Sequence, residues 1–240
     1  MMELTVLGMN GPFPAALGAT SGYLLRGEST NIALDLGTGT LSRLTAMMMP
    51  ESLDALLLSH WHYDHCSDVL PLLFRLQACA EKPLHVYAPV DESSAIRKIV
   101  MQDGSFVLHE IVPGDTLQIG EWTVNVFAAR HPVPGVMLRI SDGQKTLCYT
   151  GDTNTTDSLT EFAQDADLLL ADGLFPAAKW NEKLPHLSAE KAALLAKAAK
   201  VGHLVITHLN PTIDPETLLR EARAIRPDAE LARIGAVYRV

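Results

Sequence analysis

The stretch HWHYDH, residues 60–65, places three imidazoles and one carboxylate within six positions, directly after an apolar run, and is the most informative segment of this chain. Borderline divalent metals prefer these side chains. In an extended segment alternate side chains share a face, so His60 and His62 can bind the same ion. If the chain then turns into a helix, Asp64 and His65 point toward a second ion nearby. The stretch therefore predicts two metal ions, an arrangement that serves phosphoryl and acyl hydrolysis.

The composition sets limits on the kind of protein. The chain has 240 residues, of which 48% are hydrophobic and 20% charged, which predicts a single globular domain over residues 1–240. Its formal charge of −9 argues against a main role in gripping long polyanions, because phosphate contacts need Lys and Arg. A small anionic substrate held by metals stays compatible with this charge. We therefore expect a small-molecule substrate and no nucleic-acid polymer.

The same numbers bear on location. No apolar run approaches the length of a membrane span, and the N-terminal segment lacks the pattern of a secretory signal. The cysteines at positions 66, 79 and 148 are odd in number and form no C-x-x-C pair, which favours a reduced, cytoplasmic setting. We expect no membrane contact, and a homodimer stays open.

The pattern of elements predicts an α/β fold. Short apolar runs separated by turns predict strands in the first half, and the last third alternates helices with strands. We expect a helix over about Ser67–Cys79, and another that is capped by Asp91 and runs to about Val100. Trp61 and Tyr63 alternate with the histidines and are expected to pack inward. Mixed strands with helices at both ends of the chain predict two mixed β-sheets with helices on their outer faces.

Three further residues follow apolar strands and complete a dinuclear site. They are His131, Asp152 and His208, and each lies where a strand is expected to end. A carboxylate can bridge two cations with its two oxygens, and this is the role predicted for Asp152. The order of these residues after the HWHYDH stretch strengthens the metal interpretation.

Longer phrases carry a family resemblance. They are SHWHYDHCSDVLPL at 59–72, HPVPGVMLRI at 131–140 and PHLSAEKAALLAKAAKVGHLVITHLNP at 185–211. With these phrases the chain resembles the metallo-β-lactamase-fold hydrolase superfamily over nearly its whole length, and within it the ribonuclease Z and small phosphodiesterase-like branch. The resemblance implies a four-layer αββα sandwich.

The resemblance also implies a set of site residues for two divalent ions, zinc in the first place and Mn²⁺ or Fe as alternatives. The implied ligands of the first ion are His60, His62 and His131, those of the second are Asp64, His65 and His208, and Asp152 bridges the two.

Two catalytic residues and one supporting residue are implied in the same way. His186 matches a histidine that faces the scissile phosphate, and Asp64 is also assigned the orientation of the attacking hydroxide. Asp35 matches a position that supports the ligand histidines from behind, although an ordinary turn residue would have the same appearance in the sequence.

The chain departs from ribonuclease Z at one motif. Where such sequences carry His-Glu-Ala-Thr, this chain reads Ala171-Asp172-Gly173-Leu174. Asp172 either pairs with His186 in place of the Glu or is a turn acid. No Gly/Pro- and Lys-rich insertion corresponds to the arm with which ribonuclease Z grips transfer RNA, which argues against a tRNA 3′-end processing endonuclease.

The leading hypothesis is a dinuclear metal-dependent hydrolase, a phosphodiesterase that cleaves a small phosphodiester such as a cyclic nucleotide with a metal-bound hydroxide. The alternative is a lactone or thioester hydrolase of the same fold. A metal-binding or redox module without hydrolysis is the least favoured, because every expected ligand position holds a suitable residue.

Overall fold

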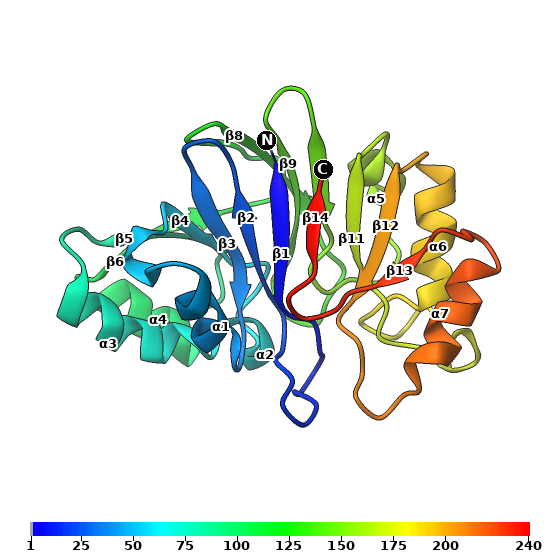
Figure 1. The fold of residues 1–240 in the computed structure, drawn as a ribbon, viewed down its shortest axis with the longest axis horizontal. Coiled ribbons are helices and arrows are strands. Elements are labelled where there is room, and N and C mark those ends of the chain that lie inside the picture. Colours follow the sequence, from blue (N-terminus) through cyan, green and yellow to red (C-terminus); the bar gives the residue numbers. More distant parts are fainter. Residues whose placement is uncertain (1) are drawn as a thin grey trace.

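Two seven-stranded sheets stacked face to face form the centre of the molecule, as the computed structural model of residues 2–240 shows (Figure 1). The first sheet has the order β14 (Val237–Arg239), β1 (Glu3–Gly8), β2 (Gly22–Arg26), β3 (Asn31–Leu36), β4 (Ala55–Leu57), β5 (Leu84–Pro89) and β6 (Phe106–Ile111). The second sheet has the order β13 (Glu230–Leu231), β12 (His203–Thr207), β11 (Leu168–Asp172), β10 (Thr146–Tyr149), β9 (Val136–Ser141), β8 (Trp122–Ala128) and β7 (Thr116–Ile119).

Helices cover the outer face of each sheet (Figure 1). Those on the side of the first sheet are α1 (Thr40–Met47), α2 (Tyr63–Cys66), α3 (Val69–Cys79) and α4 (Ala95–Gln102). Those on the side of the second sheet are α5 (Leu159–Ala163), α6 (Ala189–Ala198) and α7 (Pro215–Arg223). Two short 3₁₀ helices lie at Pro50–Ser52 and Ala177–Lys179. None of the helices within residues 2–240 is long and apolar enough to cross a bilayer.

Three buried clusters hold these layers together, and β11 shows how. Leu168 and Leu170 face the core between the sheets, while Leu169 and Ala171 face the core beneath α5 and α6. Alternate side chains of a strand point to opposite faces, so a strand covered on both sides is apolar throughout. A third core lies between the first sheet and its helices. The expected four-layer α/β fold with two mixed sheets is therefore confirmed.

Both sheets are antiparallel on one side and parallel on the other. β3 to β6 run parallel in the first sheet, and β10 to β13 run parallel in the second. The segment that follows β4 leads into α2, and α2 lies toward the lower edge of the molecule in Figure 1. In α/β proteins the carboxyl ends of parallel strands are where sites form.

Two local expectations were wrong. Asp91 does not cap a helix: α4 begins later, and the Ser94 hydroxyl accepts a hydrogen bond from Arg97 N at 3.1 Å. Ser94 is preferred because its side chain directly precedes the first turn, where free N–H groups need an acceptor. Tyr63 does not pack inward: it begins α2 and is 65% exposed, while Trp61 is buried as expected.

Candidate metal centre

The HWHYDH stretch changes conformation in its middle. His60 and His62 lie in extended backbone before α2, and Asp64 and His65 lie within the helix. The change from a two-residue to a helical period gives the second pair of side chains a different direction from the first, although the rings of His60 and His65 stay 4.2 Å apart between centroids. One peptide therefore contributes to two separate groups of candidate ligands.

The first group consists of His60, His62, His131 and Asp152, whose ligand atoms lie within 4.8 Å of one another. His131 Nε2 is 3.1 Å from His62 Nδ1, and His60 Nε2 is 3.7 Å from Asp152 Oδ2. Two ligand atoms bound tetrahedrally to one zinc at about 2.1 Å are about 3.4 Å apart. The spacing of this group is therefore that of ligands around a single ion.

The second group consists of Asp64, His65, Asp152 and His208, again within 4.8 Å. His65 Nε2 lies 3.6 Å from Asp64 Oδ2 and 3.2 Å from Asp152 Oδ1, and His208 Nε2 lies 3.9 Å from Asp64 Oδ2. Asp152 belongs to both groups: its Oδ1 faces the second and its Oδ2 the first. The structure thus brings all seven predicted ligands together, and their role as metal ligands stays a prediction.

The donor atoms in this cluster fit divalent cations. Nine buried side-chain atoms within residues 2–240 lack a hydrogen-bond partner, and four of them lie in this cluster: His60 Nε2, His65 Nε2, His208 Nε2 and Asp152 Oδ1. Leaving one buried polar atom unpaired costs about 1–3 kcal/mol. Four such atoms converging in one place are explained when each has a cation as its partner.

Four of the five histidines in the cluster have the ionisation state that metal ligands require. Burial holds the pKa of His60, His62 and His208 below the usual value, and it lowers the pKa of His131 to about 4. These rings are neutral at pH 7, with a free nitrogen lone pair.

Asp152 stays ionised. Burial alone would raise the pKa of Asp152, but the facing His208, His65 and His60 hold it well below the usual value. Asp64 differs, since burial raises its pKa to about 6. The cluster therefore offers four neutral imidazoles around one ionised, shared carboxylate. His65 differs: burial alone would lower its pKa, but the facing Asp152 and Asp35 raise it well above the usual value, so a cation at His65 must displace a proton.

Three residues behind the cluster fix the ring orientations. Asp35 Oδ2 accepts from His65 Nδ1 at 2.7 Å, from Tyr149 Oη at 2.5 Å and from Ser59 Oγ at 2.8 Å. Ser59 Oγ also lies 3.1 Å from His60 Nδ1. With each Nδ1 engaged in this way, Nε2 is the nitrogen that faces the other ligands.

Two of these supporting residues were not foreseen in the sequence. Ser59 directly precedes the histidine stretch, and Tyr149 lies three positions before Asp152, but only the fold places them against Asp35. The structure places Asp35 where the resemblance implied, with its backbone in the left-handed region at φ 55°. Non-glycine residues in that region often mark functional sites.

His186 and Asp172 form a pair beside the cluster. His186 Nδ1 lies 2.9 Å from Asp172 Oδ2 and 3.8 Å from Asp152 Oδ2. Burial would lower the pKa of His186, but the adjacent Asp172 raises it to about 9, while burial raises the pKa of Asp172 to about 6. Of the two alternatives for Asp172, the structure supports pairing with His186 over a simple turn role.

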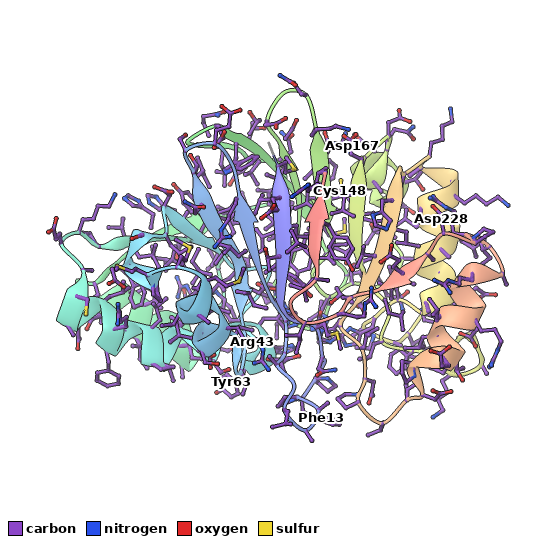
Figure 2. The ribbon with its side chains drawn as sticks, viewed as in Figure 1. Phe13, Arg43, Tyr63, Cys148, Asp167 and Asp228 are labelled. Carbon is purple, nitrogen blue, oxygen red and sulfur yellow. The ribbon has the colours of Figure 1, made fainter. Side chains whose placement is uncertain are left out.

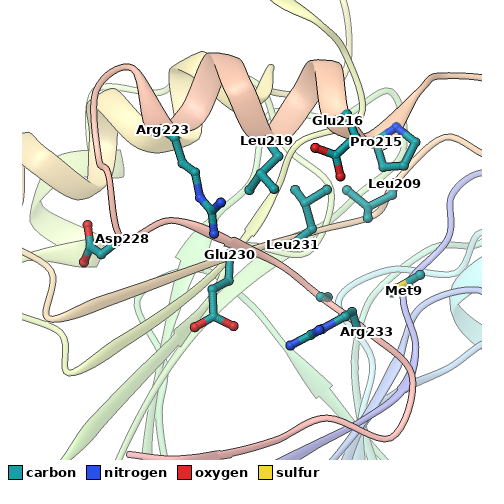
Figure 3. A pocket seen from close by; sticks show the side chains of 11 residues that line it. Met9, Leu209, Pro215, Glu216, Leu219, Arg223, Asp228, Glu230, Leu231 and Arg233 are labelled. Carbon is teal, nitrogen blue, oxygen red and sulfur yellow. The ribbon is translucent and has the colours of Figure 1, made fainter.

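A separate hollow of about 550 Å³ lies between α7 and β13, and Leu209, the residue after His208, is part of its lining (Figure 3). Its floor is apolar, with Leu209, Leu219 and Leu231, and charged side chains such as Arg223 and Glu230 surround it. None of the seven candidate ligands lines this hollow.

Comparison with known proteins agrees with this geometry. Residues 30–209 match the family described as "Beta-lactamase superfamily domain". The probable metallo-hydrolase YhfI of Bacillus subtilis (strain 168) is 33% identical, with 99% of this chain and 99% of YhfI covered. The crystal structure of YhfI superposes with a TM-score of 0.93 at 32% identity, over 99% of this chain and 98% of that one.

Two further proteins are similar over their full lengths. Ribonuclease Z of Methanopyrus kandleri is 27% identical, with 100% of this chain and 98% of the relative covered. The crystal structure of Zn²⁺-bound PqqB from Methylobacterium extorquens has a TM-score of 0.79 at 18% identity, with both chains covered to 100%. The likeness to PqqB shows the shared fold alone, and the sequence likeness to ribonuclease Z agrees with the resemblance inferred from the three phrases.

Proposed function

Because the chain belongs to the beta-lactamase superfamily, as its family match and its Bacillus relative show, we propose that it is a dinuclear metal-dependent hydrolase of small phosphodiesters. One observation carries the proposal: two groups of candidate ligands share a single buried carboxylate, Asp152. Sites with two adjacent divalent ions are suited to in-line displacement at phosphorus.

The residues have distinct roles in this proposal. His60, His62 and His131 would hold one ion and Asp64, His65 and His208 the other, with Asp152 between them. When bound, the ions, zinc or alternatively Mn²⁺ or Fe, would supply Lewis-acid stabilisation of developing charge and a lowered pKa for water. The protein contributes fixed ring orientations, through Asp35 and Ser59, and a buried carboxylate that stays ionised.

His186 is placed to act on a substrate oxygen. Its ring stacks on that of His208 at 5.0 Å between centroids and meets the ring of His131 edge-on at 5.3 Å. It therefore lies over both groups of candidate ligands. With Nδ1 paired to Asp172, the ring can present Nε2–H to the phosphoryl group or to the leaving oxygen. Asp64, at the start of α2, is the proposed residue that orients the attacking water.

A small diester is favoured over a polymer. The formal charge of −9 provides little attraction for a long nucleic acid, whose binding depends on many phosphate contacts. The relative named ribonuclease Z acts on RNA, in which the bond that is cleaved is a phosphodiester, and this supports the reaction class rather than the size of the substrate. The three free cysteines support the cytoplasmic setting that forms part of this proposal.

The test combines metal analysis with a substrate panel. The purified protein, loaded with zinc or manganese, is assayed against bis(p-nitrophenyl) phosphate, cyclic nucleotides and lactones, and its metal content is measured by mass spectrometry. We expect about two ions per chain and hydrolysis of the diesters. Hydrolysis confined to lactones, or active protein without stoichiometric metal, would contradict the proposal.

Variants separate the assigned roles. His62→Ala and Asp152→Ala should lose metal and activity together, since each removes a shared or direct ligand. His186→Ala should keep its metal and lose about 10²–10⁴-fold in rate, the range that general acid–base groups contribute. Loss of metal from His186→Ala would refute the role given to His186.

A further inference from the structure

A small pocket adjoins the first group of candidate ligands. It has a volume of about 160 Å³, and His62 forms one of its walls. The remaining walls that matter here are Tyr63, Asp91, Ser93, Ala95 and Val133. A cavity of about 150 Å³ accommodates benzene, so this pocket has room for one five- or six-membered ring.

Asp91 is the distinctive group in this pocket. It is only 7% exposed, and its Oδ1 accepts hydrogen bonds from Ser93 N at 2.9 Å and Ser93 Oγ at 2.6 Å. Its Oδ2 receives no hydrogen bond from any residue between 2 and 240, yet it is not among the atoms sealed from solvent. This carboxylate oxygen, which no donor among residues 2–240 occupies and which solvent reaches, is open to a hydrogen bond from a molecule bound in the pocket.

The two errors of the sequence analysis meet at this place. Asp91 was expected to cap a helix, and Tyr63 was expected to pack inward. Instead Ser94 caps α4, which leaves Asp91 free to face the pocket, and the ring of Tyr63 stands at its rim. Tyr63 also lies at the end of the molecule where α2 is found, as Figure 2 shows. Asp91 Oδ1 closes a local turn with Ser93, while its Oδ2 and the ring of Tyr63 are left available to a molecule in the pocket.

We propose that this pocket is the subsite for the organic group of the substrate, and that Asp91 selects a neutral ring bearing hydrogen-bond donors, as the pentose hydroxyls or base amino group of a nucleotide provide. The inference rests on the proposed function. Only a substrate whose phosphoryl group binds beside Asp152 can place its organic substituent past His62 and into this pocket. A second anionic group is disfavoured here, since the Asp91 carboxylate would repel it. The pentose and the base have one feature in common that suits the pocket. Each provides a ring that carries hydrogen-bond donors and has the size of a single sugar or pyrimidine-like ring.

Asp91→Asn tests the selection. It keeps the shape and one acceptor oxygen but removes the charge. The assay compares 3′,5′-cyclic AMP with its 2′-deoxy analogue and with cyclic IMP, which lack a hydroxyl and an amino donor respectively, and with bis(p-nitrophenyl) phosphate. The wild type should prefer cyclic AMP over at least one of the two analogues. Asp91→Asn should reduce that preference about tenfold or more, mainly through KM, because the variant loses a charge-assisted hydrogen bond.

A matched control removes the same charge elsewhere. Asp165 is exposed, adopts a positive φ that Asn also tolerates, and precedes β11. Asp167, two positions later, lies at the end of the molecule opposite Tyr63 in Figure 2. Asp165→Asn should leave the substrate preference as in the wild type. Equal changes in both variants would mean that long-range charge, not the pocket, sets the preference, and this would overturn the proposal.

A second variant fills the pocket without touching Asp91. Ala95 is exposed at the first position of α4, where Leu is a good helix former. Ala95→Leu should raise KM for cyclic AMP, and it should abolish the binding of adenosine, which carries the ring but no phosphodiester, to zinc-loaded protein in titration calorimetry. Zinc content measured in parallel shows that each variant keeps its metal.

The outcomes separate the two proposals. Diester hydrolysis that neither variant alters, with adenosine binding unchanged, would overturn the subsite and leave the proposed function standing. Failure of the zinc-loaded wild type to hydrolyse any diester would overturn the proposed function, and the subsite with it.

Discussion

Asp35 is a buried carboxylate that belongs to neither group of candidate ligands, yet its hydrogen bonds hold ligand side chains in position. It accepts hydrogen bonds from His65, Tyr149 and Ser59, including 2.7 Å from the Ser59 backbone N–H. In Asp35→Asn an amide N–H₂ would face at least one of these donors. We predict that zinc affinity falls about 10–100-fold, the usual effect of losing a group that orients a ligand histidine. Titration against a fluorescent zinc chelator measures it.

The control for Asp35→Asn is again Asp165→Asn, which changes the net charge equally at an exposed position. The control should bind zinc as the wild type does. Equal zinc affinity in Asp35→Asn and the wild type would show that His65 needs no carboxylate behind it.

At the scale of single residues, the sequence predicted the candidate ligands because their spacing has a local meaning. The alternation of His60 and His62 and the turn into α2 depend only on near neighbours. Ser59 and Tyr149 escaped notice because serine and tyrosine occur everywhere in proteins. Their importance comes from contacts with Asp35, and Tyr149 is 114 positions from it in the chain.

Among the elements, the loop after β1 provides a sharp test of His208. Gly11 N donates to Leu209 O at 3.1 Å, and a Cβ on Gly11 would lie 2.1–2.3 Å from three atoms of the His208 ring. Gly11→Ala must therefore displace the ring or the loop. We predict a loss of about 1–3 kcal/mol in the free energy of unfolding, as for overpacking elsewhere, together with reduced metal content. Chemical denaturation and mass spectrometry measure the two effects.

Gly104→Ala is the matched comparison, because a Cβ at Gly104 meets nothing within 4 Å. Its stability should be unchanged or slightly raised, since alanine restricts the unfolded chain. If Gly11→Ala proved as harmless as Gly104→Ala, the close packing of the loop on His208 would be wrong.

Two histidines face each other near the edge of the first sheet. On neighbouring strands β5 and β6, His109 stacks on Tyr87 at 4.5 Å, and its Nε2 lies 2.7 Å from His85 Nδ1. Burial, with a contribution from His85, holds the pKa of His109 below 6.5. The unfolded chain then binds more protons than the folded one as the pH falls through 6.5, so stability is full above that pH and declines below it.

We therefore predict that His109→Gln loses less stability than the wild type between pH 7.5 and 5.5. Urea denaturation at the two pH values gives the comparison, in which the difference between the proteins isolates His109 from the other titrating groups. An identical decline in both would show that this ring titrates equally in the folded and unfolded chains.

Element boundaries were predictable where a proline or an apolar period fixed them, and less so where two polar residues compete for one cap. Asp91 and Ser94 both suit the start of α4, and only the path of the chain past Pro89 decides between them. Tyr63 was misplaced because strand alternation was extended one residue into α2. Both errors fall where a helix begins, since a change of period there reverses the face of every later side chain.

At the scale of the whole molecule, the centre joins the two sheets. Each group of candidate ligands takes two residues from the segment after β4 of the first sheet and two from segments after strands of the second. This joining could not be derived from composition or periodicity, because strand order between distant segments leaves no local trace in the sequence. The division of the ligands between two ions came instead from the family resemblance, which implied the ligand set and the four-layer fold.

Bound ions should therefore stabilise the packing of one sheet on the other. At a free zinc concentration about 100 times the dissociation constant, each occupied site contributes about 2.7 kcal/mol, which for a chain of this length raises Tm by about 5–10 °C per site. Calorimetry of the protein in chelator and in zinc measures the shift. Asp152→Asn should show a smaller shift, because it weakens the one residue common to both groups, while Asp165→Asn should shift as the wild type does. A wild-type Tm that is the same in chelator and in zinc would mean that the seven side chains, although they converge, do not bind metal in the folded protein.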